Sequence, residues 1–370
     1  MERFSELLKG KFAFGCMRMQ CKENGEIDMD NFRAMVDCYL DAGFNYFDTA
    51  HVYFDGKSEL ALREGLTSRY PRESYVLTNK LTSSCFETEE EIRPLFETQL
   101  KACGVDYFDF YLIHSVLQSN YGKYVDCHAF EIVQELKAEG KVKHVGMSFH
   151  DSPEFLDRVL TEHPEIEVVQ IQFNYLDLDD PNVQSQACLE VCKKHDKPVF
   201  VMEPVKGGGL VFLPDAALET LNALHEGSPA EIALRFAAEQ EQVVMVLSGM
   251  TTLDQVRENV AFMKDAKPLS DAAHEAIRTV RGMIRALPLV ACTGCRYCTE
   301  GCPMQINIPG IFRCVNDRIK FPNRPNSRYG WVTKNGGKAS DCIECGACEA
   351  ICPQHLEIRD LLKQAAEQFE

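Results

Sequence analysis

Short apolar runs alternate with amphipathic segments over the first three quarters of the chain. Eight runs rich in Val, Ile, Phe and Tyr have the length of strands, and several are nearly continuous apolar stretches, as is typical of parallel strands buried on both faces. They lie at residues 12–15, 46–50, 75–79, 110–114, 144–148, 168–173, 198–203 and 243–249. Residues 30–43, 88–104 and 228–240 between them have the apolar spacing of helices.

Eight strands, each followed by a helix or a gap long enough for one, predict an α/β fold. This number and order of elements is typical of a (β/α)8 TIM barrel, which we place at residues 1–285. A doubly wound open sheet is the alternative, and the lack of a G-x-G-x-x-G run after the first strand disfavours it. In a barrel the chemistry lies at the C-terminal ends of the strands.

Four polar side chains follow the ends of strands two, three and four. They are Asp48 and Tyr53, then Lys80, then His114. A phenol has a pKa near 10, so proton transfer at neutral pH is helped by a neighbouring ammonium that lowers this pKa. Asp48 can hold Lys80 charged, and His114 can orient a carbonyl. These residues predict a proton-transfer site.

The stretch from Asp48 to Glu59 reads D-T-A-x-x-Y-x-x-G-x-S-E, and with Lys80 and His114 it resembles the signature of the aldo-keto reductase family. The resemblance covers about residues 1–285. It implies an NAD(P)H-dependent oxidoreductase that interconverts a carbonyl and an alcohol. It further implies a catalytic tetrad of Asp48, Tyr53, Lys80 and His114, with Tyr53 as general acid.

The same resemblance implies a set of cofactor-binding residues. Ser148 and Gln170 match positions that hold the nicotinamide amide, although Phe149 stands where the family has Asn. The loop after strand seven, with Met202, Lys206 and Gly207, matches the pyrophosphate loop. Met202 replaces the usual stacking aromatic. The matching adenosine-phosphate segment contains Ser248, Gly249, Met250, Gln255, Glu258 and Asn259.

The adenosine-phosphate segment leaves the choice between NADP(H) and NAD(H) open. Family members selective for NADPH place Lys or Arg there, since a phosphate needs a charged partner. Here only Arg257 is basic. The family favours NADPH, whereas these residues favour NADH or weak discrimination.

Nine of the 17 cysteines follow residue 290, and eight of them form the run C-x2-C-x2-C-x3-C-P twice. In such runs three thiolates bind one [4Fe–4S] cluster and the fourth binds the other. One cluster would take Cys292, Cys295, Cys298 and Cys352, and the second would take Cys342, Cys345, Cys348 and Cys302. Zinc fits this spacing poorly. Cys314 lies outside both runs and is expected to be a packing residue.

The cysteine runs resemble those of two-cluster ferredoxin domains, and we place this domain at residues 286–370. Helical patterns at 309–320 and 356–369 favour a mostly α-helical type over a compact β type. The segment 323–341 between them is basic, loop-like and carries the only Trp, Trp331.

Composition limits the partners. Acidic residues outnumber basic ones, 56 to 39, for a net charge of −17, which argues against nucleic acid and anionic membranes. No apolar run is long enough to span a bilayer, and the N-terminus has no apolar signal segment. We therefore expect a cytoplasmic protein with a small-molecule carbonyl or alcohol substrate.

Three functions remain open. The barrel is a self-contained carbonyl reductase with structural clusters, or the clusters pass electrons from a ferredoxin-like partner to a substrate in the barrel. The third alternative is a non-catalytic subunit that senses nicotinamide. The intact tetrad argues against the third, and the first is the leading interpretation.

Overall fold

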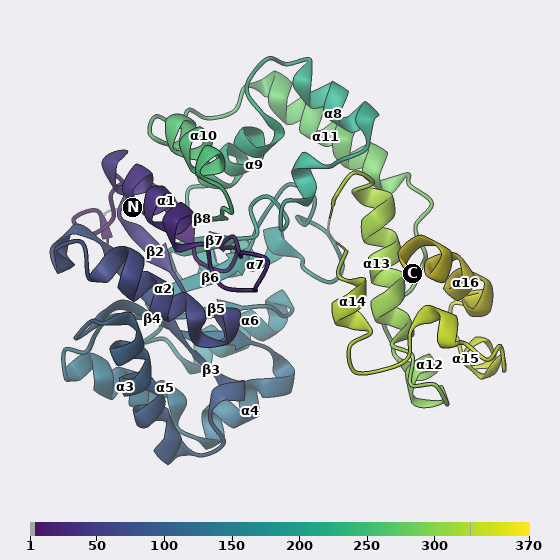
Figure 1. Cartoon of the computed structure of the whole chain (residues 1–370), viewed down its shortest axis with the longest axis horizontal. Helices are drawn as coiled ribbons and strands as arrows, with labels where there is room; N and C mark the ends of the chain where they lie inside the picture. The colour runs from purple at the N-terminus through teal and green to yellow at the C-terminus, as the bar shows by residue number, and fades with distance from the viewer. Residues whose placement is uncertain (1–3, 326) are drawn as a thin grey trace. The chain divides into compact units, whose positions relative to one another are not determined.

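The computed structural model of the chain describes residues 4–325 and 327–370 (Figure 1). Residues 1–3, which belong to the first predicted domain, and residue 326, in the basic loop, lie outside the described residues. The chain divides into two compact units.

The first unit contains a closed barrel of eight parallel strands in the order β1 to β8 (Figure 1). This confirms the TIM barrel and rules out the open sheet. The strands are β1 Phe12–Gly15, β2 Tyr46–Asp48, β3 Val76–Thr82, β4 Phe108–Val116, β5 Val142–Phe149, β6 Val168–Gln172, β7 Val199–Met202 and β8 Val243–Gly249. The predicted runs match β1 and β8 at both ends, whereas β4 and β5 extend beyond the predictions.

Helices follow the strands around the outside of the barrel. They are α1 Met29–Asp41, α2 Lys57–Leu62, α3 Ile92–Cys103, α4 Gln118–Asp126, α5 Ala129–Ala138, α6 Pro153–Glu162, α7 Ser185–Lys194, α9 Pro229–Ala238 and α10 Leu253–Met263. Local sequence sets their limits. Asp28 caps α1 by accepting a hydrogen bond from the Asn31 amide. Gly104 caps the C-terminal end of α3 with a φ of 68°, a left-handed conformation that is strained for residues with a side chain.

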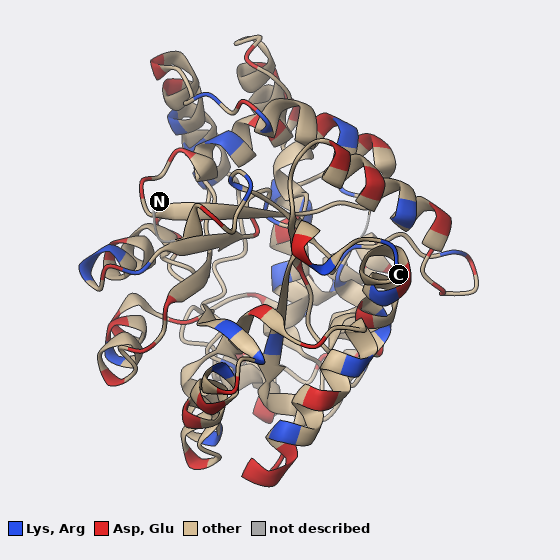
Figure 2. Cartoon of the chain, turned by 90° about the vertical axis from the view of Figure 1, so that its left-hand side faces the viewer, with Lys and Arg blue, Asp and Glu red and all other residues tan. Residues whose placement is uncertain are grey.

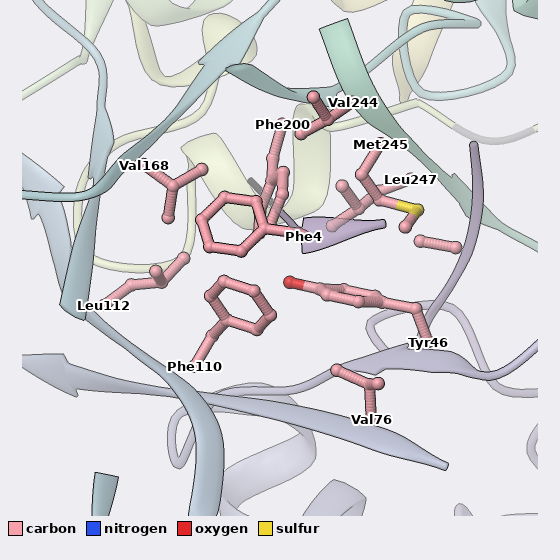
Figure 3. Packing of buried hydrophobic residues seen from close by; sticks show 11 residues of the cluster. Phe4, Tyr46, Val76, Phe110, Leu112, Val168, Phe200, Val244, Met245 and Leu247 are labelled. Carbon is pink, nitrogen blue, oxygen red and sulfur yellow. The ribbon is translucent and has the colours of Figure 1, made fainter. Parts of the chain in front are cut away.

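Aromatic and aliphatic side chains fill the interior of the barrel (Figure 3). Phe110 meets Phe4 and Phe200 edge to face, with ring centroids 5.2 and 5.1 Å apart. Tyr46 packs on Phe200 and accepts a hydrogen bond at its hydroxyl from Thr78. This packed interior holds the strands in register, so that the strand ends present their polar side chains in fixed positions.

The second unit consists of Gly208–Pro229 and Asp271–Glu370. Its helices are α8 Asp215–Asn222, α11 Asp271–Arg285, α12 Tyr297–Glu300, α13 Ile308–Lys320, α14 Tyr329–Val332, α15 Ala347–Ala350 and α16 Ile358–Phe369. The mostly α-helical character is thereby confirmed. The boundary predicted after residue 285 stays a prediction, since contacts group α8 and α11 with the C-terminal helices.

Charged residues of both signs are interspersed along the outer helices (Figure 2). Of the helices formed by residues 4–325 and 327–370, none has the length and apolar character that crossing a membrane requires.

Candidate active site and cluster sites

Three strands deliver the predicted catalytic residues. Asp48 ends β2, Lys80 lies on β3, His114 lies on β4, and Tyr53 begins a 3-10 turn that follows β2. The Lys80 ammonium donates to Asp48 Oδ1 at 2.6 Å, to the Thr49 carbonyl at 2.7 Å and to the Tyr53 hydroxyl at 3.3 Å. Asp48, Lys80 and Tyr53 therefore form one hydrogen-bonded chain.

The Lys80–Asp48 ion pair is almost fully buried, with residue exposures of 1% and 3%. Burial alone would lower the pKa of Lys80, but Asp48 and Tyr53 outweigh it and raise this pKa. Burial raises the pKa of Asp48, and Lys80 offsets part of that change. The ammonium therefore stays charged at neutral pH beneath the Tyr53 ring, 4.9 Å from its centroid.

The expected lowering of the pKa of Tyr53 is wrong for this structure. Burial raises this pKa, and the opposing effect of Lys80 is too small to reverse it. Asp48 adds to the rise because its negative charge partly cancels that of the ammonium. Tyr53 is therefore a protonated phenol over the neutral range, a state suited to donating a proton.

His114 lies beside this chain as a neutral imidazole. Its ring meets the Tyr53 ring edge to face with centroids 6.1 Å apart, and its Nδ1 is 2.6 Å from the Thr82 hydroxyl. Burial holds the pKa of His114 well below its usual range, and Lys80 and His150 add to this. The structure thus brings all four predicted residues together.

A strained turn positions Tyr53. Phe54 and Asp55 have φ values of 52° and 53°, in the left-handed region, and Gly56 follows at 83°. Just outside the turn, His51 Nδ1 lies 2.7 Å from the carboxylate of Glu59, which is fully buried and accepts from Asn79 at 2.7 Å. These contacts tie the turn to α2 and β3, which offsets its backbone strain.

Sequence reasoning missed these supporting residues. Glu59 belongs to the signature stretch, but no role was assigned to it, and nothing in the sequence marks Thr82 or Asn79 as partners. Their pairing depends on the barrel register. Thr82 lies opposite His114, since β3 and β4 pair at these two residues.

Two of the predicted cofactor residues are neighbours in the sheet. Ser148 on β5 pairs with Gln170 on β6, and both are buried. The Ser148 hydroxyl accepts from the Ser115 amide at 2.7 Å. The Gln170 side-chain oxygen is buried without a hydrogen-bond partner among the described residues. An unpaired acceptor in this position fits the NH2 group of a nicotinamide amide.

The loop after β7 holds Met202, Lys206 and Gly207, and its backbone has an unusual course. Lys206 and Gly207 have φ values of 50° and 60°. The Lys206 ammonium forms an ion pair with the buried carboxylate of Asp177, so its charge is already neutralised inside the protein. Met202 ends β7 and is partly buried.

The segment after β8 begins α10 with a capping box. The Gln255 side-chain oxygen accepts from the Thr251 amide at 2.7 Å, and Asn259 donates to the Ser248 hydroxyl at 3.2 Å. Gly249 and Glu258 are exposed, whereas Met250 is buried and packs inside the protein. The Met250 side chain packs inside the protein, so a binding role for this residue would involve its backbone and stays a prediction.

The eight cysteines of the two runs surround two separate cavities in the second unit. One cavity is lined by Cys292, Cys295, Cys298 and Cys352. The other is lined by Cys302, Cys342, Cys345 and Cys348. Each cavity thus receives three cysteines from one run and the fourth from the other run. Four thiols around an otherwise apolar space fit a [4Fe–4S] cluster.

Comparison with known proteins decides the family. The model of the aldo/keto reductase family matches residues 11–281. The chain belongs to this family. A 4Fe-4S dicluster domain matches residues 291–356, so the family barrel is followed by an iron–sulfur domain.

Relatives of this aldo/keto reductase are distant. It is 25% identical over 287 residues to the NADH-specific methylglyoxal reductase of Escherichia coli K12. The matched region covers 65% of this chain and 85% of that protein. It is 26% identical over 327 residues to a probable aldo-keto reductase of Glycine max, covering 78% of this chain and 88% of that one.

Solved structures agree in fold. An aldo-keto reductase from Klebsiella pneumoniae in complex with NADPH superposes with a TM-score of 0.60 at 20% identity, covering 73% of this chain and 90% of that one. An aldo/keto reductase from Brucella melitensis gives a TM-score of 0.57 at 26% identity, covering 73% and 94%.

Proposed function

We propose that the barrel catalyses the NAD(P)H-dependent interconversion of a small-molecule carbonyl and its alcohol, with Tyr53 as the general acid and base. The observation that carries this proposal is the buried Asp48–Lys80–Tyr53 chain beside a neutral His114. A reduced nicotinamide supplies the hydride when it is bound. Ser148 and the unpaired Gln170 oxygen would hold its amide.

Each residue has a separate part in the proton transfer. Tyr53 donates the proton of its hydroxyl to the carbonyl oxygen, which becomes the alcohol. The phenolate left behind lies beside the Lys80 ammonium, and Asp48 keeps that ammonium charged and in place. If the Thr82 hydroxyl donates to Nδ1, the His114 proton lies on Nε2, where it can donate to the same carbonyl oxygen.

Removal of the Tyr53 hydroxyl tests this role. We expect Tyr53→Phe to lower kcat for carbonyl reduction by about 10²- to 10⁴-fold, the usual range for a general acid. Binding of NADPH or NADH, followed by quenching of nicotinamide fluorescence, should change little. Methylglyoxal, the substrate in the name of one relative, is a suitable first probe among small carbonyls.

Tyr70→Phe is the matched control, because its hydroxyl donates to Asp37 away from the strand ends. It should leave kcat unchanged. If Tyr53→Phe kept activity within a few-fold of the native protein, Tyr53 would not be the acid.

We further propose that the two cysteine-lined cavities each hold one [4Fe–4S] cluster. The support is the crossed arrangement, in which Cys352 joins the first run and Cys302 joins the second. One-electron relay from a ferredoxin-like partner is the second candidate function. It is favoured by the presence of two such sites, since folding alone needs fewer metal ligands.

A further inference from the structure

A cation that is not among the cofactor-binding residues implied by the family resemblance reaches the loops where a dinucleotide phosphate is expected. Arg18 lies three residues beyond the end of β1, and β1 pairs with β8 so that Gly15 is opposite Gly249. The stem of Arg18 lies against Gly249. A Cβ added to Gly249 would lie 2.9 Å from the Arg18 Cδ atom, so a side chain at this position would require Arg18 to shift.

The guanidinium of Arg18 points toward the end of β7. Its Nη2 atom lies 3.5 Å from the carboxylate of Glu203, the residue that follows β7. Arg18 thus joins the ends of β1, β8 and β7 across the loops that hold the proposed cofactor residues.

Comparison with Lys206 shows which cation is available to a ligand. Lys206 pairs with Asp177, whose side chain is 2% exposed and whose second oxygen accepts from Asn174 at 2.7 Å. Arg18 has one long contact, and the side chains of Arg18 and Glu203 are 35% and 27% exposed. An anionic phosphate can therefore separate Arg18 from Glu203 at a small cost in free energy. A phosphate that bound Lys206 instead would leave the buried Asp177 carboxylate without its charge partner.

We infer that Arg18 is the cation that binds a phosphate group of the dinucleotide, and that Glu203 competes with the phosphate for it. The inference rests on the proposed function, because it assumes a nicotinamide dinucleotide in the barrel. A guanidinium offers paired donors that match phosphate oxygens. The phosphate is either the pyrophosphate, shared by both cofactors, or the 2′-phosphate that only NADPH carries.

Binding of NADPH and NADH to the anaerobically purified full chain tests the inference without turnover. We expect Arg18→Gln to weaken binding by about tenfold or more, the effect of one lost charge-assisted contact. Equal weakening of both cofactors assigns Arg18 to the pyrophosphate, and weakening of NADPH alone assigns it to the 2′-phosphate. A change below twofold for both cofactors overturns the inference.

Two further variants guard against a purely structural effect. Glu203→Gln removes the competitor and should tighten binding of the same cofactor by a few-fold, which a loss of packing would not produce. Arg33→Gln is the matched control, since Arg33 pairs with Asp30 and Glu64 on the outer helices and should leave both affinities unchanged.

The outcome is separable from that of the proposed reaction. If Tyr53→Phe retains carbonyl reduction but Arg18→Gln weakens cofactor binding, the acid assignment fails and the phosphate assignment stands. If neither cofactor binds the native protein at millimolar concentration, the inference and the proposed function fail together.

Discussion

The barrel site and the cysteine-lined cavities reach their chemistry by different routes. In the barrel the chain itself supplies the partners of Lys80, whose ammonium contacts Asp48, Thr49 and Tyr53 within 3.3 Å. In the second unit eight cysteines line two cavities. Folding alone thus assembles the ion pair of the first site, whereas on the function proposed above the second site is completed by bound clusters.

The difference follows from how much apolar surface each part can bury. The barrel strands are almost entirely buried and fill one large core, which can bear the cost of a buried ion pair. The dicluster match spans only residues 291–356, and a domain of that size rarely gains enough from apolar burial. Metal ligation then contributes directly to its folding free energy.

The largest expected effect is the response of the second unit to iron removal. We expect chelation under anaerobic conditions to unfold the helices around the cavities, while the barrel keeps its structure and its nicotinamide binding. Trp331, the only tryptophan, is 79% exposed and therefore a poor reporter of unfolding, so the second unit is followed by limited proteolysis, with new cleavage expected within Asp271–Glu370. Near-UV circular dichroism of the tyrosines reports mainly the barrel.

Cysteine variants sharpen the same test. Cys345→Ala removes a proposed ligand from one cavity and should lower bound iron by about half if each cavity holds one four-iron cluster, as proposed. Cys314→Ala, in a buried position outside both cavities, should leave the iron content unchanged. Unchanged protease resistance of Asp271–Glu370 after complete loss of iron would contradict the comparison, because the second unit would then be as self-sufficient as the barrel.

The two parts also differ in what their sequences reveal. The barrel was predictable because continuous apolar runs mark strands buried on both faces, and the catalytic set because Asp48, Lys80 and His114 each follow or end such a run. The cysteine grouping was predictable for another reason. Spacing of three, three and four residues along the chain restricts which thiols can reach one cavity.

Effects that depend on three-dimensional surroundings were not predictable. The pKa of Tyr53 is raised because burial outweighs Lys80, and the sequence shows the charge but not the burial. Met250 was placed in the cofactor segment by position alone, although its side chain packs inward. Arg18 was missed because its importance comes from the β1–β8 pairing that brings it over Gly249.

A second prediction concerns the stability of the barrel site. We expect Lys80→Met to lower the free energy of unfolding by about 3–5 kcal/mol, because it leaves the Asp48 carboxylate buried without its charge partner. Asp48 Oδ2 already lacks a hydrogen-bond partner among the described residues, so no other group there can compensate. Urea unfolding followed by tyrosine circular dichroism measures the change.

The double variant Lys80→Met/Asp48→Leu should recover most of this stability but no activity. Lys101→Met, on the exposed face of α3, is the control and should change stability by less than about 0.5 kcal/mol. If Lys80→Met alone changed the free energy of unfolding as little as the control does, the barrel would not depend on the Lys80–Asp48 ion pair, and the contrast with the second unit would fail.

The smallest predicted effect is an acid sensitivity that belongs to the barrel alone. His150 follows β5, and burial lowers its pKa to about 4, with a hydrogen bond from its ring to Gln172 opposing and Lys80 adding to the change. The unfolded chain binds this proton near pH 6.5 and the folded chain only near pH 4, so stability falls as the pH drops between these values.

Between pH 7.5 and pH 5 the free energy of unfolding of the native barrel should fall by about 2 kcal/mol more than that of His150→Gln, which lacks the titrating group. Urea unfolding of both proteins at the two pH values, with tyrosine circular dichroism as the signal, measures the difference. Equal losses would mean that burial does not lower the pKa of His150 in the folded barrel.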